Sequence, residues 1–345
     1  MGADEIDASR GRRRGVADEH RRRQVSGPGE PGSRHGGSQQ SAGPGTRVGP
    51  PQQRPALRGK GEDPSFVGSY VPKLVFVDSG SASLAGTASG DAESRPWFDK
   101  EGEVVGRACV ADGTHFVELD GVARFSFDAT GPNVTAVPAP AAEKKLVAEY
   151  FRRWILPVAV HVRGLEVLHA SAVLASGGVA AFSAASEAGK STIAHGLGTR
   201  GLRIWTDDAL AFDVDGDGPR AFALPYRLRL RPASATHFGL EPSTGGTITV
   251  ESEPGVEEEA PIAVLFLLER RPVGPAVHVE PIEPVQAFPT LVERSYHFGG
   301  EESERKRAML SRYLELASAV PVYRLSMATG LEHLEAVLDA VQERL

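Results

Sequence analysis

The segment 178–200 constrains the fold of this chain more than any other, because it joins a strand pattern to a helix pattern through a loop of small residues. The apolar run Val179–Ser183 is typical of a buried strand. The loop after it ends in Gly189–Thr192 (GKST) and opens a helix over 190–199. In such a layout backbone N–H groups and a helix N-terminus face an anion, a lysine reaches the outer phosphates and a hydroxyl holds Mg²⁺. The segment therefore predicts an α/β fold with a phosphate-binding loop.

The predicted loop departs from the pattern G-x-x-x-x-G-K-[ST] at its first position, where Ala184 replaces glycine. Glu187 stands where related loops often carry another glycine, and a non-glycine residue in left-handed geometry costs about 1–2 kcal/mol. Its carboxylate would also lie near a polyphosphate unless it turns to solvent or helps to hold a metal. The alternative is an ordinary strand-to-helix turn without a ligand. The predicted nucleotide-binding residues are Ala184, Ala185, Ser186, Glu187, Ala188, Gly189, Lys190, Ser191 and Thr192.

Two adjacent carboxylates, Asp207 and Asp208, follow a second apolar run, 202–206. The carboxyl end of a strand is where ligand-facing residues lie in an open α/β sheet. One carboxylate of such a pair can face Mg²⁺ while the other accepts a proton from a hydroxyl. We predict Ser191 and Asp207 as metal ligands, and the sequence leaves open which aspartate is the base. A plain strand-end turn is the alternative for this pair.

Charge and composition divide the chain at about residue 60. The first 60 residues contain two arginine triplets and 12 basic against 6 acidic side chains, so the remaining 285 carry a net charge of −13 within a total of −7. The Gly/Pro/Ser/Gln-rich segment 1–62 lacks the apolar periodicity needed to bury a core, and we expect a disordered leader. Nucleic-acid binding by this leader is a minor alternative, and the acidic remainder argues against it for the core. The single cysteine excludes a disulfide framework, and with no membrane-spanning run we expect a cytoplasmic protein without a membrane partner.

The rest of the chain reads as two parts. Short β-like runs over 63–140 predict a small β-rich module. A helix with aromatic residues at three- and four-residue spacing is expected over 141–156 as a connector, with its aromatic stripe in the core and Pro157 ending or bending it. Strands and helices then alternate to the end, so 141–345 is predicted as a nucleotide-binding α/β domain with a mixed sheet.

Three further features have competing interpretations. His169 lies in an apolar run 21 residues before Lys190, and a lone histidine in a strand is usually a core residue. The acidic run Asp213–Gly218 imitates the start of a calcium loop but lacks its final glutamate, so we expect a hairpin turn. The alternating arginines 227, 229 and 231 form either a solvated strand face or a surface for a phosphate or an acidic substrate.

Three segments of the chain together resemble a known family. The run from Leu168 and His169, the loop ending Gly189-Lys190-Ser191 and the segment 204–208 (IWTDD) are similar in order and spacing to the catalytic domain of HPr kinase/phosphorylase and to HPr-kinase-like proteins of unassigned substrate. The similarity is good over about 162–214 and loose to Leu345. It implies an ATP-dependent serine kinase fold related to ATP-type phosphoenolpyruvate carboxykinase.

The resemblance also implies roles for individual residues. His169, Lys190 and Asp208 fall on active-site positions, with Asp208 as proton acceptor, Asp207 as the adjoining acid and Ser191 as an Mg²⁺ ligand. The later E-x-R-G-x-G-type signature of the family, which supplies a second Mg²⁺ ligand, has no counterpart here. The resembled family forms hexamers, which implies that this chain can form a homo-oligomer.

Two functions follow as hypotheses. The first is a kinase that uses ATP and Mg²⁺ and transfers a phosphoryl group to a hydroxyl-bearing acceptor, serine-like, on a peptide, a protein or a small molecule. The second is a catalytically degenerate nucleotide-binding or regulatory protein of the same fold, which the replacements at 184 and 187 favour. The retained site residues favour the kinase. The sequence leaves open the acceptor and whether the donor is ATP, GTP or pyrophosphate.

Overall fold

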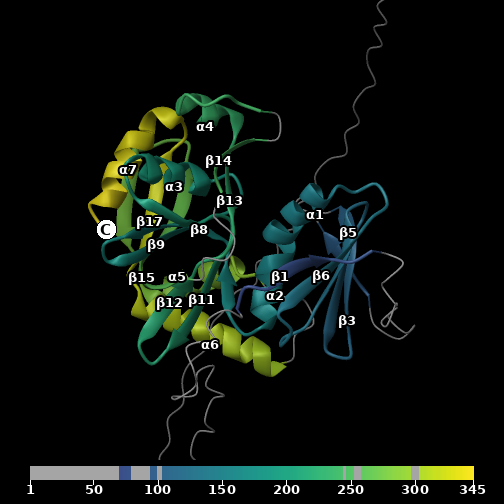
Figure 1. Cartoon of the computed structure of the whole chain (residues 1–345). Coiled ribbons are helices and arrows are strands. Elements are labelled where there is room, and N and C mark those ends of the chain that lie inside the picture. The colour runs from purple at the N-terminus through teal and green to yellow at the C-terminus, as the bar shows by residue number, and fades with distance from the viewer. Residues whose placement is uncertain (1–69, 79–93, 99–102, 244–245, 252–257, 297–302) are drawn as a thin grey trace, which may run out of the picture. The chain divides into compact units, whose positions relative to one another are not determined.

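The computed structural model describes residues 70–78, 94–98, 103–243, 246–251, 258–296 and 303–345. These residues belong to one compact unit, Lys60–Leu345. The predicted leader 1–62 and the first residues of the predicted β-rich module lie outside the described ranges. The described part is a mixed α/β structure with two large sheets and one two-stranded ribbon, as Figure 1 shows.

The first sheet has six strands in the order β1-β6-β5-β4-β3-β2 and is antiparallel except where β1 meets β6. Apolar side chains alternate along β5, so one face of the sheet is buried while the other carries polar residues. The predicted β-rich runs are confirmed here, and a further strand, β2, joins the edge. The strands are β1 (Lys73–Phe76), β2 (Arg95–Phe98), β3 (Val104–Ala111), β4 (Thr114–Leu119), β5 (Ala123–Phe127) and β6 (Asn133–Pro138).

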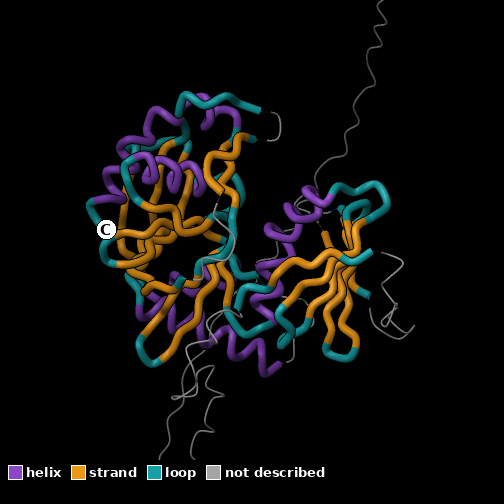
Figure 2. The backbone as a smooth tube through the Cα atoms, viewed as in Figure 1, coloured by secondary structure: helices purple, strands orange, loops and turns teal. Residues whose placement is uncertain are grey.

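A helical segment follows this sheet and is longer than predicted. It begins as α1 (Lys144–Tyr150), widens into the π-helical turn η2 (Phe151–Ile155) and continues as α2 (Leu156–Val162). Pro157 does not end it, because proline is tolerated in the first turn of α2, where its missing N–H is not needed. The buried side chains of the segment share a core with the six-stranded sheet, and Figure 2 shows the two side by side.

The second sheet has nine strands, and its centre is the 13-residue strand β15 (Glu259–Arg271). β15 is parallel to β9 and β17 and antiparallel to β12, so the predicted mixed sheet is confirmed. The remaining strands extend the sheet on both sides in the order β10-β8-β9-β15-β12-β11-β7, with β16 beyond β17. They are β7 (Glu166–Leu168), β8 (Ala170–Ala175), β9 (Gly178–Ser183), β10 (Arg203–Thr206), β11 (Leu210–Asp215), β12 (Gly218–Phe222), β16 (Val277–Pro281) and β17 (Val322–Ala328).

Helices cover this sheet with two separate cores. α3 and α7 share one core with β9 and the middle of β15, and α5 and α6 share the other with β11 and β12. Gly196 of α3 lets α7 approach, because a Cβ there would lie 2.7 Å from a methyl carbon of Leu338. The helices are α3 (Lys190–Thr199), α4 (Pro232–His237), α5 (Pro284–Glu293), α6 (Ser303–Ala319) and α7 (Leu334–Gln342), with the short turn η3 (Leu331–His333) before α7.

Two local features bear on the site. A two-stranded ribbon, β13 (Arg227–Leu230) with β14 (Thr247–Glu251), carries the alternating arginines. The acidic run at 213–218 forms the β11–β12 hairpin, which confirms the predicted turn. Among the helices described here, none is long and apolar enough to cross a bilayer.

Candidate functional site

The loop between β9 and α3 contains two residues with positive φ. Gly189 caps α3 with a φ of 106°, and Glu187 adopts a φ of 72°. The slot at 187 therefore requires a left-handed conformation, which explains why glycine suits it and why glutamate there is strained. The carboxylate of Glu187 forms an ion pair with the guanidinium of Arg231, which balances its negative charge.

Lys190 is buried at the first position of α3. Its ammonium lies 3.2 and 3.3 Å from the carbonyl oxygens of Ala184 and Ala185. It also lies 3.0 Å from Nε2 of His169, which must accept because an ammonium only donates. Burial lowers the pKa of Lys190, while the two aspartates act in the opposite direction. The lysine thus joins the loop to the strand on which His169 lies.

His169 occupies a break between β7 and β8, which pair with different strands. Its Nδ1 donates to the backbone carbonyl of Asp208 at 2.9 Å, so both ring nitrogens have partners in the neutral form. Burial, and then the charge of Lys190, lowers the pKa of His169. The histidine faces the lysine and is placed in the site rather than in the apolar core.

Tyr296 is a site residue that sequence reasoning missed. Its hydroxyl lies 3.3 Å from Nδ1 of His169 and 3.4 Å from the carbonyl oxygen of Asp208, and its ring meets the imidazole edge-on. Burial raises the pKa of Tyr296. No local pattern marks this residue, because its place depends on contacts 127 residues along the chain.

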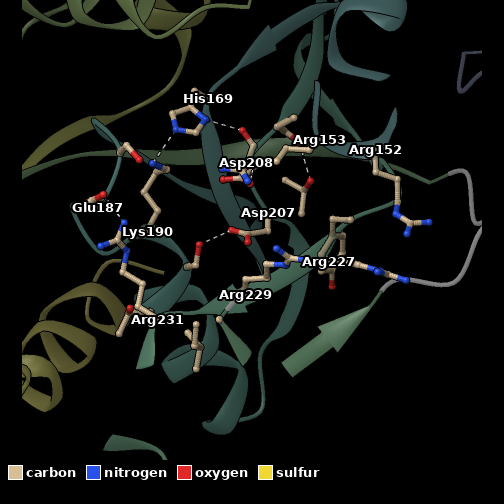
Figure 3. Close-up of a pocket in the computed structure, with 18 of the residues that line it drawn as sticks. Arg152, Arg153, His169, Glu187, Lys190, Asp207, Asp208, Arg227, Arg229 and Arg231 are labelled. Atoms are coloured by element: carbon tan, nitrogen blue, oxygen red, sulfur yellow. Dashed lines mark hydrogen bonds and ion pairs between the residues drawn. The ribbon is translucent and has the colours of Figure 1, made fainter. Parts of the chain in front are cut away.

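Asp207 is a buried carboxylate that accepts hydrogen bonds from two hydroxyls and from the backbone N–H of Arg229. Ser171 Oγ and Ser191 Oγ both donate to its Oδ1, at 2.5 and 2.8 Å. Burial, and then the charge of Asp208, raises the pKa of Asp207 to about 6. Its neighbour Asp208 has a φ of 66°, which breaks the alternation of a strand, and both aspartates line the cavity. Figure 3 shows the two carboxylates between Lys190 and a group of arginines.

The cavity has a volume of about 1030 Å³ and is rich in cationic side chains. Its lining includes the buried Lys190 and both aspartates. Six arginines from three parts of the chain also line it: Arg152, Arg153, Arg227, Arg229, Arg231 and Arg270. Sequence reasoning missed Arg152, Arg153 and Arg270. Arg270 lies at the carboxyl end of β15, where its Nε donates to the carbonyl of Ala188 at 3.0 Å. Arg270 follows the apolar part of β15, and ligand-facing residues lie at the carboxyl ends of such strands, so the sequence could have indicated it as a site residue.

Two sequence interpretations need correction here. The three arginines do not form a purely solvated strand face. Arg227 and Arg229 of β13, and Arg231 directly after it, line the cavity and form ion pairs with Glu251, Glu149 and Glu187. The aromatic stripe of the helical segment is not wholly core. Phe151 is buried, whereas Trp154 lines the cavity and stacks on Trp97 with ring centroids 6.4 Å apart.

The oxygen atoms of Ser191 and Asp207 fit a magnesium ion in kind and in place. They converge at the start of α3, and Mg²⁺ takes few protein ligands because it keeps waters and phosphate oxygens. A bound cation would also offset the charge of this buried carboxylate, because the side-chain donors to Asp207, Ser171 and Ser191, are uncharged. The residues described here contain no cluster of three or more His, Cys, Asp or Glu side chains that could hold a metal by themselves.

Comparisons with known proteins give similarity to solved structures alone. No family model matches the chain, and no curated protein matches it. Among solved structures, the chain is similar to the HPr(Ser) kinase/phosphatase from Coxiella burnetii, with 12% sequence identity and a TM-score of 0.29. That match covers 51% of this chain and 88% of the other.

Proposed function

We propose that this protein binds ATP with Mg²⁺ at the β9–α3 loop and transfers the terminal phosphoryl group to a hydroxyl-bearing acceptor. The observation that carries the proposal is the convergence of four groups in one cavity: the loop, Lys190, the Ser191–Asp207 pair and the cavity-facing carboxylate of Asp208. A lysine at the start of a helix, beside the positive end of the helix dipole, is disfavoured unless an anion balances it. Polyphosphate is the anion that this geometry suits.

The proposed roles divide among the residues. Lys190 balances the charge of the transferring group, and Ser191 and Asp207 hold Mg²⁺, which when bound neutralises phosphate charge. Asp208 accepts the proton of the acceptor hydroxyl as its oxygen attacks the terminal phosphorus and the bond from phosphorus to the ADP oxygen breaks. Neutral His169 orients Lys190 through Nε2 and the backbone of Asp208 through Nδ1.

The backbone and charge of Glu187 favour a second candidate function. Glu187 retains the strained φ of a glycine slot and brings a carboxylate to the loop. A catalytically degenerate protein of the same fold would bind Mg-ATP without transferring its phosphoryl group. The ion pair of Glu187 with Arg231 reduces this objection, because a guanidinium already balances the carboxylate.

The first test is calorimetric titration of the full chain with Mg-ATP. We expect Lys190→Ala to weaken binding by about 100-fold or more, because several charge-assisted hydrogen bonds are lost. Lys306→Ala, at an exposed position of α6, is the matched control and should leave the affinity unchanged. Absence of binding to ATP, GTP and pyrophosphate by the wild type would overturn the nucleotide site.

The second test separates the kinase from the degenerate binder. Transfer of phosphate from radiolabelled ATP to water, to the protein itself and to small hydroxyl compounds is measured for the wild type and for Asp208→Asn. The kinase predicts transfer by the wild type and a loss of about 10²–10⁴-fold in the variant, with Mg-ATP affinity retained. Binding without any transfer would leave the regulatory function as the conclusion.

A further inference from the structure

The arginines of the cavity fall into two groups on opposite sides of the aspartates. Figure 3 shows Glu187 and Arg231 beside Lys190 on one side, and Arg152, Arg153 and Arg227 on the other. We refer to Arg152, Arg153 and Arg227 as the arginine cluster. On the side of Lys190, the β9–α3 loop, Lys190 and Ser191 already supply the groups that bind a polyphosphate under the proposed function. The arginine cluster therefore faces the region left for the other substrate.

The charges of the arginine cluster are incompletely balanced. Arg227 Nε donates to Oε1 of Glu251 at 2.7 Å, and the same oxygen is the ion-pair partner of Arg152, at 3.8 Å. Two guanidinium groups thus share one carboxylate oxygen. Burial, and then the charge of Arg227, lowers the pKa of Arg152, while the charges of Glu251 and Glu149 act in the opposite direction.

Unused hydrogen-bond donors accompany this charge. Nε of Arg152 is buried and has no hydrogen-bond partner among the described residues. The ion pair of Arg153 joins Nε to Oδ2 of Asp208 at 3.9 Å, which is beyond hydrogen-bond distance. A buried donor without a partner is costly, and an oxygen anion would satisfy it and reduce the repulsion between the arginines.

The position of the arginine cluster determines where the remainder of a molecule lies when its anionic group is bound there. Arg153 is adjacent to the carboxylate of Asp208, which is the proposed proton acceptor. Arg152 and Arg153 are both held by the π-helical turn η2, and Trp154 of the same turn stacks on Trp97 in the cavity wall. An anion on the arginine cluster would thus place a hydroxyl a few bonds away beside Asp208.

We infer that the acceptor is a small hydroxyl compound that carries a carboxylate or a phosphate group, and that Arg152 and Arg153 bind this group with help from Arg227. The inference rests on the proposed function for the role of the molecule as acceptor. The anion site itself stands on the unpartnered Nε of Arg152 and on the carboxylate that Arg152 and Arg227 share. Hydroxy acids, hydroxy amino acids and phosphorylated alcohols have the required chemistry.

Anion binding is tested with the loop site disabled. The full-length Lys190→Ala protein is titrated with inorganic phosphate and, separately, with malonate, at constant ionic strength set with chloride, and tryptophan fluorescence and thermal unfolding are followed. We expect saturable binding of at least one anion, and the stronger one identifies the group as phosphate or carboxylate. No response, or a response that chloride reproduces, overturns the inference.

The residues are tested by adding Arg152→Gln/Arg153→Gln to the Lys190→Ala protein. We expect anion affinity to fall by about tenfold or more, because charge-assisted hydrogen bonds are lost. Arg152→Lys/Arg153→Lys should restore part of it and verifies that the chain folds with both positions changed. The matched control is Arg271→Gln/Arg307→Gln, outside the cavity lining, which should bind as the parent protein does. Equal affinity in the Gln and control variants overturns the assignment.

The proposed function and this inference can fail separately. With Lys190 intact, Arg152→Gln/Arg153→Gln should keep its Mg-ATP affinity within about twofold. If the wild type fails to bind Mg-ATP while the Lys190→Ala protein binds the anion, the nucleotide site is wrong and the anion site stands. If Mg-ATP binds and no anion does, the acceptor class is wrong and the nucleotide site stands.

Discussion

Two buried carboxylates of the nine-stranded sheet, Glu166 and Asp207, are in opposite electrostatic situations. Arg305 and Arg312 of α6 donate to Oε1 of Glu166 at 2.7 and 3.0 Å. Burial alone would raise the pKa of Glu166, but hydrogen bonds with His161 and Arg305, and the charge of Arg305, lower it to about 2. Asp207 accepts hydrogen bonds from two hydroxyls and one backbone N–H, all uncharged, and burial and the charge of Asp208 raise its pKa to about 6.

The two carboxylates differ in the partners that the fold gives them. Glu166 is fully buried, and its charge is compensated within the fold by arginines that tie β7 to α6. Asp207 is also buried, but its side-chain donors are uncharged hydroxyls, and under the proposed function a bound Mg²⁺ would compensate its charge. Two predictions test this comparison and a third concerns the loop beside Asp207, from the largest expected effect to the smallest.

Replacing Glu166 by glutamine should destabilise the protein most. The variant leaves Arg305 and Arg312 without their shared carboxylate, and breaking a buried pair costs about 3–5 kcal/mol. Urea unfolding at pH 7 measures the loss. Glu258→Gln, which breaks an ion pair between partly exposed Glu258 and Arg203, is the control and should cost less than about 1 kcal/mol. A loss at Glu166 no larger than the control would contradict the comparison.

Replacing Asp207 by asparagine should have the opposite sign at alkaline pH. The folded pKa is raised, so the ionised carboxylate costs stability above pH 6, and the cost disappears as pH falls below its ordinary value near 3.8. A shift of this size corresponds to about 3 kcal/mol. We expect Asp207→Asn to gain stability at pH 8 and to gain nothing at pH 4, in urea unfolding without nucleotide.

The pH profile of Glu166 runs the other way and serves as the reference. Its folded pKa is lowered, so its stabilising contribution is present above about pH 4.5 and is lost as pH falls toward 2. Destabilisation of Asp207→Asn at both pH values would show that its hydroxyl partners, rather than its charge, dominate.

Replacing Glu187 by glycine should have the smallest effect. The substitution relieves a left-handed conformation worth about 1–2 kcal/mol and removes an exposed ion pair worth less than about 1 kcal/mol. We expect a gain of about 1 kcal/mol in thermal unfolding, together with slightly tighter Mg-ATP binding. Glu187→Ala, which keeps the strain and removes the charge, separates the two contributions. Equal stability of the two variants would mean that strain at this slot is negligible.

Much of the fold could be predicted from the sequence, because periodicity reports local geometry. The strand–loop–helix unit at 178–199 and the helix 303–319 lie where the pattern places them. The π-helical turn was not predicted, because the apolar spacing was interpreted with the period of a regular α-helix and π-turns are rare. The break at His169 was missed for a related reason: the run is apolar throughout, and only pairing with two different neighbours divides it.

The site was predictable where its residues are close in sequence. Lys190, Ser191 and the aspartates lie in two short segments whose residue types indicate phosphate chemistry. Tyr296, Arg152 and Arg153 could not be found this way, because these residues reach the site only through the tertiary fold. The ion pair between Arg229 and Glu149 joins residues 80 positions apart, and no local pattern encodes it.

The left-handed backbone at Asp208 decides which experiments on this residue can be interpreted. Its carbonyl oxygen holds the imidazole of His169, while its side chain faces the cavity. Asparagine shares the tolerance of aspartate for positive φ, so Asp208→Asn removes the charge and preserves the carbonyl. Alanine would resist the same backbone conformation, and a chain that relaxed there would turn the carbonyl away from the histidine. Lost activity in Asp208→Ala would then report two defects at once, the missing carboxylate and a misplaced imidazole.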